Sequence, residues 1–170
     1  FFNSGLMYRV YNDLVAEGVM SYVSVKPDNE MGHFADMGLS NVWKLSGPDV
    51  KALGTVFVNP ATVDFSAVAT KAISSGPDCV DLTYLGLIPN SVPQMYRALA
   101  DAGFKGIILP GIMSQDELDQ LVQAVGKEIV EGGECPSYDT TSQTDPRMRS
   151  FLDAYDQAYG GADITPTNVM

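Results

Sequence analysis

The chain has 170 residues, of which 45% are hydrophobic and 18% are charged, so it is long enough for one domain, or two small lobes, with a proper core. Lysine and arginine total 10 against 21 aspartates and glutamates, which gives a formal net charge of −11. This balance argues against nucleic-acid binding, because a phosphate-binding surface needs clustered lysine and arginine. No run of about 18 apolar residues occurs, so the sequence predicts no membrane span.

The first part of the chain is predicted as helix, strand, loop and strand. Asn3 or Ser4 is placed to cap a helix that runs to about Glu17. The β-branched and aromatic residues at 19–25 predict a strand. We then expect a loop at 26–30, an irregular glycine-rich segment at 31–39, a short strand at 41–45, a turn at 46–49 and a strand at 55–58.

The middle of the chain, residues 64–111, carries the clearest pattern. Apolar residues recur at positions 65, 68, 69, 72 and 73, and again at 92, 95, 96, 99 and 100, which is the spacing of one helix face. Short apolar runs at 79–85 and 106–109 predict strands. Amphipathic helices that alternate with short apolar strands predict an α/β fold with a parallel sheet covered on both faces.

The last part of the chain begins with a capping box, Ser114 to Glu117, which predicts the start of a helix. A strand-like segment at 135–138 and a polar loop at 140–144 are expected to follow. Asp145 and Pro146 then predict the start of a final helix that carries Tyr159 near its end.

A series of landmarks in the second half of the chain resembles a known family. The landmarks are Asp64-Phe65-Ser66, Gly76-Pro77-Asp78-Cys79-Val80, Tyr84-Leu85-Gly86, Ala102-Gly103-Phe104-Lys105-Gly106, Glu131-Gly132, Asp145-Pro146, and Phe151 with Tyr155 and Tyr159-Gly160. Their order and spacing resemble the second lobe of the type I periplasmic binding proteins, and more narrowly the branched-chain-amino-acid-binding branch that serves ABC importers. The resemblance implies a doubly wound parallel sheet that forms part of a two-lobed fold.

The resemblance also implies a division of the chain. Residues 1–50 are expected to be the tail of the first lobe with the hinge crossing, and residues 51–170 an incomplete second lobe. One strand–helix unit of the family is expected to be missing near 54–55. A truncated protein, an internally deleted one, and a chain given without some of its pieces all stay open. Both ends read as cuts through a longer protein, so we expect any export signal to lie upstream.

Candidate ligand-binding residues follow from the rule that open parallel sheets bind ligands beyond the carboxyl ends of their strands, together with the resemblance. They are Asn3, Ser4 and Gly5; Lys26, Pro27 and Asp28; Tyr84, Leu85 and Gly86; and Pro110, Gly111, Ile112 and Met113. Three of these groups also have an ordinary structural interpretation, because Asn3 or Ser4 can be a simple helix cap, 26–28 a solvated turn and Tyr84 a core residue.

The second of the two later loops bears on the ligand class. In amino-acid-binding members of the family, a carboxylate from this loop pairs with the ligand ammonium group. The loop from Pro110 to Met113 offers no acid, which argues against an α-amino acid. An apolar or aromatic carboxylate, or an amide, suits Ile112 and Met113 as well or better.

The sequence contains no catalytic constellation and no metal-binding spacing. His33 is the single histidine, and no phosphate-binding glycine loop occurs. Cys79 is expected to be a small core residue, and a disulfide between Cys79 and Cys135 stays open. We therefore expect no cofactor, no metal and no enzymatic activity.

The resemblance implies the solute-binding component of an ABC uptake system, located in the periplasm or outside the cell. Its partners would be a small ligand, amino-acid-like or carboxylate, and a membrane permease that recognises the closed form. Two alternatives stay open. One is a ligand-sensing domain of a receptor or regulator with the same fold, and the other is a small α/β enzyme.

Overall fold

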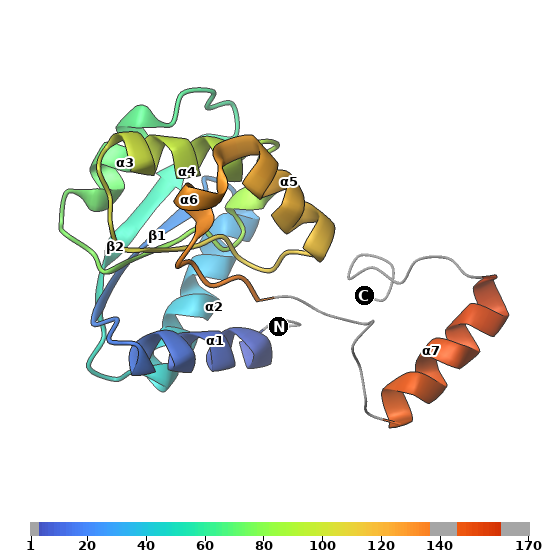
Figure 1. Cartoon of the computed structure of the whole chain (residues 1–170). Coiled ribbons are helices and arrows are strands. Elements are labelled where there is room, and N and C mark those ends of the chain that lie inside the picture. The colour runs from blue at the N-terminus through green and yellow to red at the C-terminus, as the bar shows by residue number, and fades with distance from the viewer. Residues whose placement is uncertain (1–3, 137–145, 161–170) are drawn as a thin grey trace.

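A computed structural model describes residues 4–136 and 146–160. The body of the molecule is a four-stranded parallel sheet. Helices cover both faces of this sheet (Figure 1). The strands lie in the order β2-β1-β3-β4. Their bounds are β1 Ser21–Pro27, β2 Lys51–Val58, β3 Cys79–Asp81 and β4 Ile107–Leu109. The chain moves outward from β1 to β2, then returns past β1 to β3 and β4, so the predicted doubly wound α/β fold is confirmed.

The helices divide between the two faces of the sheet. On one face lie α1 (Ser4–Ala16) and α2 (Glu30–Ser46), and on the other lie α3 (Ser66–Ile73), α4 (Ser91–Asp101) and α5 (Gln115–Val125) (Figure 1). The remaining helices are η1 (Leu85–Leu87), α6 (Lys127–Val130) and α7 (Pro146–Tyr159). The helices predicted from the 3.6-residue spacing are therefore confirmed.

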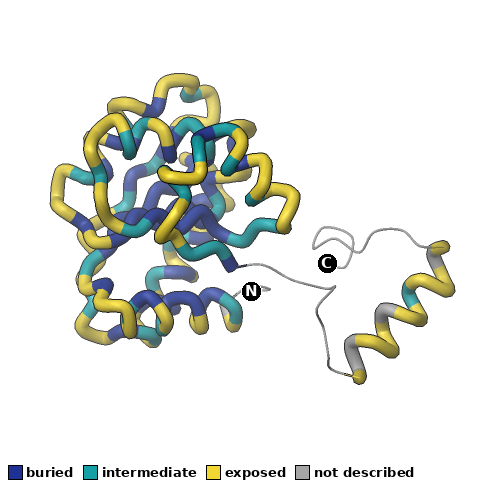
Figure 2. The backbone as a smooth tube through the Cα atoms, in the orientation of Figure 1, coloured by how far each residue is buried: buried dark blue, intermediate teal, exposed yellow. Residues whose placement is uncertain are grey.

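Each face of the sheet has its own apolar core, and Figure 2 shows the buried residues gathered along the strands and the inner sides of the helices. Under α1 and α2 the largest buried side chains are Trp43 and Tyr11. On the opposite face, the large buried side chains include Met95, Tyr96 and Leu99 of α4. Full burial of one such apolar side chain stabilises the fold by about 1.5–3 kcal/mol. The two cores hold the strands in one plane and so fix where the strand ends lie.

Helix α2 corrects two predictions, because residues 31–39 are not irregular and residues 41–45 are not a strand. The helix begins at Glu30 and is capped by Asn29, whose side-chain oxygen accepts a hydrogen bond from the Gly32 amide at 2.9 Å. Its buried residues recur every three or four positions from Gly32 through Ala35 and Leu39 to Val42, and Trp43 follows directly. The β-branched and aromatic content of 41–45 favoured a strand locally, but tertiary packing of this face decides for a helix.

Gly32 explains why a glycine-rich segment is helical here. A Cβ atom at this position would overlap the carbonyl oxygen of Pro27, the last residue of β1. Glycine is therefore present because the helix passes very close to the end of the strand, and it does not mark a flexible loop.

Strand β2 runs from Lys51 to Val58 and includes 54–55, where the sequence predicted a missing strand–helix unit; its register against β1 shifts by one residue at Leu53. The strand–helix unit directly before β2 is β1 with α2. β1 precedes the predicted lobe boundary at residue 50, yet it is hydrogen bonded to both β2 and β3, which follow it. Strands from both predicted parts thus form one sheet, while the division of the intact protein into lobes stays a prediction.

Two further boundaries differ from the sequence prediction. The strand predicted at 79–85 ends at Asp81 and is followed by a turn and η1. Within the described residues Cys135 and Pro136 are not in a strand, and residues 137–138 of that predicted strand lie outside the described part of the chain.

Candidate functional site

The candidate site lies at the carboxyl edge of the sheet, where β1 ends at Pro27 and β3 ends at Asp81. These two strands are neighbours, and the chain leaves one toward β2 and the other toward β4. That reversal is a topological switch point, the place where open α/β sheets form their ligand crevice.

A buried ion pair closes the switch point. The Lys26 ammonium lies 3.2 Å from Oδ1 of Asp81 and 3.5 Å from its backbone oxygen, and neither side chain is exposed to solvent. An isolated charge buried in this way would be strongly unfavourable, so each residue depends on the other. The pair joins the carboxyl ends of β1 and β3.

Three further donors satisfy the Asp81 carboxylate. The Thr83 amide donates to Oδ1 at 2.8 Å, the Tyr11 hydroxyl donates to Oδ2 at 2.8 Å, and the Trp43 indole N–H donates to Oδ2 at 3.3 Å. With Lys26 this gives four donors on two oxygens, which fills the accepting capacity of a carboxylate. Asp81 therefore organises its surroundings and has no lone pair left for a ligand.

The donors to Asp81 belong to an aromatic stack. The Tyr11 and Trp43 rings lie 3.9 Å apart between centroids at 13°, and Tyr22 stacks on the same indole at 4.5 Å and 12°. Tyr11 comes from α1, Trp43 from α2 and Tyr22 from β1, so the stack ties both helices of this face to the central strand. Such ring contacts stabilise beyond the area they bury.

The electrostatics of the cluster follow from burial and from the Asp81 charge. Burial by itself raises the pKa of Asp81, but the Lys26 charge and the hydrogen bonds from Thr83 and Tyr11 outweigh it and lower that pKa below its usual value. Burial, followed by the adjacent Asp81 charge, raises the pKa of Tyr11 well above its ordinary range. Asp81 is therefore ionised and Tyr11 is a neutral donor at neutral pH.

The loop after β3 is held in an unusual conformation beside this cluster. Tyr84 has a φ of 73°, which is rare for a residue with a side chain, and its half-buried ring packs against the α1–α2 core. The Thr83 hydroxyl oxygen is buried and has no hydrogen-bond partner in the described structure. A strained residue at a strand end is a feature expected of a ligand-contacting loop.

The loop after β4 lies against the loop after β3. The Leu82 amide donates to the Leu109 carbonyl at 2.8 Å. Gly111 has a φ of 100°, and a Cβ atom there would lie 3.2 Å from the Cα of Thr83. Gly111 thus allows the two backbones to approach closely where their strands end.

The structure places the predicted site residues in different surroundings. It brings together Lys26, Tyr84, Leu85, Pro110 and Gly111 at the carboxyl edge, of which Lys26, Leu85, Pro110 and Gly111 are buried. The other predicted residues with described side chains are Pro27, which is buried; Ile112 and Met113, which are half-buried; and Gly5, Asp28 and Gly86, which are exposed.

Two of the predicted segments need separate comment. Asp28 is 58% exposed and pairs with the His33 imidazole at 2.9 Å, so the 26–28 segment faces the interior at Lys26 and solvent at Asp28. Ser4 is the first residue of α1, and Asn3 lies outside the described residues.

Sequence reasoning missed Asp81, Tyr11, Trp43 and Thr83. A single acid between Val80 and Leu82 in an apolar strand was the available signal, because a buried carboxylate requires partners. Nothing local in the sequence indicates that those partners come from α1, α2 and β1.

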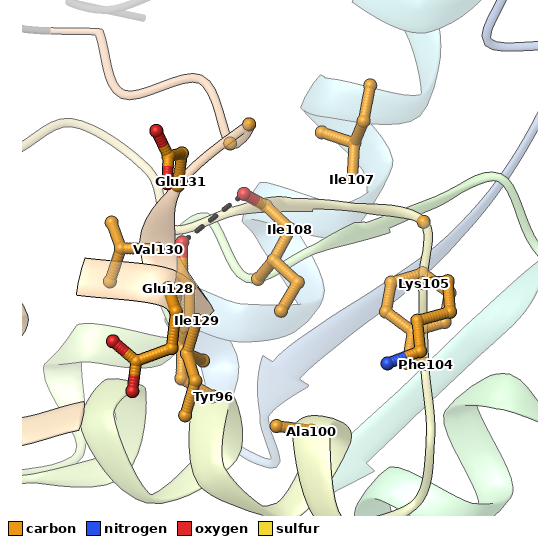
Figure 3. A pocket seen from close by; sticks show the side chains of 13 residues that line it. Tyr96, Ala100, Phe104, Lys105, Ile107, Ile108, Glu128, Ile129, Val130 and Glu131 are labelled. Atoms are coloured by element: carbon orange, nitrogen blue, oxygen red, sulfur yellow. Dashed lines mark hydrogen bonds between the residues drawn. The ribbon is translucent and has the colours of Figure 1, made fainter. Parts of the chain in front are cut away.

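Two pockets lie near the α4 face. One of about 360 Å³ is at the carboxyl edge between the start of α4 and α5, and it is lined by Gly86, Met113 and Glu117 among others. The other, of about 440 Å³, lies against β4 and is lined by residues such as Tyr96, Lys105 and Glu128 (Figure 3). In Figure 3 the Tyr96 hydroxyl donates to the Ile108 carbonyl at 3.2 Å. Of these two, the smaller pocket borders the strand-end loops, at Gly86 and Met113, although Thr83 and Tyr84 do not line it.

The described residues were compared with the requirements of a metal site and of a membrane-spanning helix. Among residues 4–136 and 146–160, no group of three or more His, Cys, Asp or Glu could hold a metal ion. In the same part of the chain, no helix is both long and apolar enough to cross a membrane. Cys79 and Cys135 are free thiols, and burial raises the pKa of Cys135 to about 11.

Comparison with solved structures shows the same fold in much longer chains. A leucine-binding protein from Thermotoga maritima is 23% identical, with a TM-score of 0.58 over 93% of this chain and 42% of that chain. A branched-chain amino acid ABC transporter periplasmic ligand-binding protein from Burkholderia xenovorans is 17% identical, with a TM-score of 0.65 over 97% and 42%. An extracellular ligand-binding receptor from Rhodopseudomonas palustris is 19% identical, with a TM-score of 0.61 over 94% and 44%.

The chain thus spans less than half the length of these solved structures. No match was found among the curated proteins. The family described as periplasmic binding protein matches residues 3–170, which is nearly the whole chain. On that match, this chain belongs to the periplasmic binding protein family.

Proposed function

We propose that this chain provides a ligand-binding lobe of the solute-binding component of an ABC uptake system, in the periplasm or outside the cell. The observation that carries the proposal is the organised carboxyl edge, where the Lys26–Asp81 pair joins β1 to β3 beside the strained loop at Tyr84. An edge whose charges are paired internally and whose loop is held at Tyr84 is suited to bind a small molecule against a second lobe.

The proposed mechanism involves no bond making or breaking. A ligand held between two lobes stabilises the closed form, and a permease in the membrane recognises that form. The relatives named above, described as an ABC transporter periplasmic ligand-binding protein and an extracellular ligand-binding receptor, support this proposal. The preformed cluster would let the edge bind without reorganising, which limits the entropy lost on binding.

The ligand class that we favour is an apolar or aromatic carboxylate, or an amide, rather than an α-amino acid. An ammonium group needs a carboxylate with free lone pairs, but Asp81 is saturated by four donors. Glu117 already accepts two hydrogen bonds from Ser114 on Oε2 in its capping box, and Asp28 pairs with His33 through Oδ1, so neither carboxylate is fully free. The half-buried Ile112 and Met113 offer apolar surface at the same edge.

The proposed division of the intact protein follows from the sheet. We propose that residues 4–136 lie within one lobe, because β1 is hydrogen bonded to strands on both sides. The lobe that would close over the edge belongs to the part of the longer relatives that this chain does not span.

A thermal-shift screen of the intact protein tests the proposal. The panel contains branched-chain and aromatic amino acids, their amides, and aromatic or short aliphatic acids. A ligand at about a hundred times its dissociation constant should stabilise the fold by about 2.7 kcal/mol. Tyr84→Ala should abolish the shift, while the matched control Tyr8→Ala, at a 45% exposed position on α1, should preserve it.

The alternatives predict different results. A binding protein returns its ligand chemically unchanged, whereas the small α/β enzyme would consume it. A shift that survives Tyr84→Ala would place the ligand elsewhere and contradict the proposed site. If the ligand binds but its uptake into cells does not depend on this protein, and binding instead triggers a signalling response, the ligand-sensing domain is favoured.

A further inference from the structure

Helix α2 carries a second apolar face, which points away from the core. Met31, Phe34, Met37 and Leu45 are 50%, 49%, 60% and 72% exposed. The core-facing residues of the same helix, such as Ala35, Leu39 and Val42, lie on its other side. Single exposed apolar residues are ordinary, but four on the outer side of one helix make that side unusually apolar.

The spacing of this outer face matches a helix-pairing seam. Met31, Phe34, Gly38, Asn41 and Leu45 follow one another at alternating intervals of three and four residues, the repeat of a two-helix contact. Gly38 is the middle member, and a Cβ atom built on it meets nothing within 4 Å. A second helix can therefore approach α2 closely at its centre.

The charges beside the seam specify which helix would fit. Glu30 and Lys44 stand seven residues before and seven residues after Met37, so all three lie along one flank of the seam. If a second α2 lies antiparallel across a two-fold axis near Met37, Glu30 faces Lys44 of the partner subunit and Met37 faces Met37 of the partner subunit. A parallel pair would instead bring like charges level with each other.

We propose that the outer face of α2 pairs antiparallel with α2 of a second copy of this chain, forming a two-fold symmetric dimer. The helix has 17 residues and so extends about 25 Å. One helix pair buries less than the roughly 1,200–2,000 Å² of a stable interface, so the dimer is expected to be reversible and concentration-dependent.

The first experiment measures mass by sedimentation equilibrium of the intact protein over a wide range of concentrations. Wild type should shift from monomer to dimer as concentration rises, and Leu45→Glu should remain monomeric. Glu30→Lys and Lys44→Glu should each weaken dimerisation about tenfold, since symmetry converts two attractive pairs at once. The double variant Glu30→Lys with Lys44→Glu should restore wild-type association, because it exchanges the charges.

A matched control separates this contact from general charge effects. Lys71→Glu makes the same charge change as Lys44→Glu at an exposed position on α3, on the opposite face of the sheet, and should dimerise like wild type. If Lys71→Glu weakens association equally, or if the double variant stays as weak as its parents, the antiparallel α2 contact is wrong. Wild type that stays monomeric at every concentration also overturns it.

A cross-link tests the position of the two-fold axis directly. In a Cys135→Ser background, Met37→Cys should form a disulfide-linked dimer on mild oxidation, because residue 37 faces its own copy, while the buried Cys79 should not react. Lys71→Cys should stay monomeric under the same conditions. Equal cross-linking at both positions would indicate random collision and would refute the proposed axis.

Discussion

The substitution Asp81→Asn tests the buried ion pair most directly. Asparagine keeps the shape of aspartate but removes the charge, which leaves Lys26 as a buried and uncompensated ammonium. Breaking a buried pair by removing one partner costs about 3–5 kcal/mol. This is a large part of the roughly 5–15 kcal/mol that keeps a domain folded, and it corresponds to a fall in melting temperature of about 10 °C.

The assay is urea and thermal unfolding followed by circular dichroism at neutral pH. Asp101→Asn is the matched control, because Asp101 is exposed at the end of α4, and it should change stability by less than about 0.5 kcal/mol. The double variant Lys26→Met with Asp81→Asn removes both charges and should be more stable than Asp81→Asn alone. The reasoning would be refuted if Asp81→Asn left the melting temperature unchanged. It would also be refuted if the double variant lost as much stability as the two single substitutions lose in sum.

The same pair fixes a pH dependence. The folded pKa of Asp81 lies below its unfolded value, so its charge contributes stability that is fully present above the unfolded pKa, near 4. That contribution is lost as pH falls through the lowered folded pKa. The stability difference between wild type and Asp81→Asn should therefore be largest at neutral pH and shrink in acid, whereas a difference that persists unchanged in acid would contradict the ionised state of Asp81.

Three further substitutions test the local geometry. Gly32→Ala should destabilise the fold even though alanine favours a helix by about 1 kcal/mol, because its Cβ would overlap the Pro27 carbonyl; thermal melts measure the sign. Gly111→Ala should cost about 1–3 kcal/mol through its positive φ and its contact with Thr83, and should weaken ligand-induced thermal shifts. Ser114→Ala should cost about 1 kcal/mol in urea unfolding through loss of the α5 capping box.

The parts of the fold that the sequence predicted correctly are those that local patterns determine. The apolar spacing of α3 and α4 and the capping box of α5 each depend on residues within one or two helical turns. The parallel sheet followed from the alternation of such elements. The end of β3 was less predictable, because the apolar residues after Asp81 continue into a turn and η1.

Helix α2 was mispredicted because its local signals conflict with its packing. Gly32 and Gly38 lower helix propensity, and Val42 with Trp43 favour a strand. The structure gives each a non-local reason. Gly32 allows contact with Pro27, and Trp43 stacks between Tyr11 and Tyr22 while its indole N–H donates to Asp81. Partners that lie far away in the chain leave no local signature.

The helical state of residues 30–46 also decides how the candidate segments lie relative to one another within the sheet. Once residues 30–46 are a helix, β1 and α2 form a strand–helix unit of the same sheet that contains β3 and β4. The loop after β1 then lies beside the loop after β3, and Lys26 reaches Asp81 across the switch point. The Lys26 and Asp81 charges thus neutralise each other within this sheet. We infer that the carboxyl edge recognises its ligand mainly through the Thr83–Tyr84 loop and the apolar residues after β4, rather than through a free carboxylate.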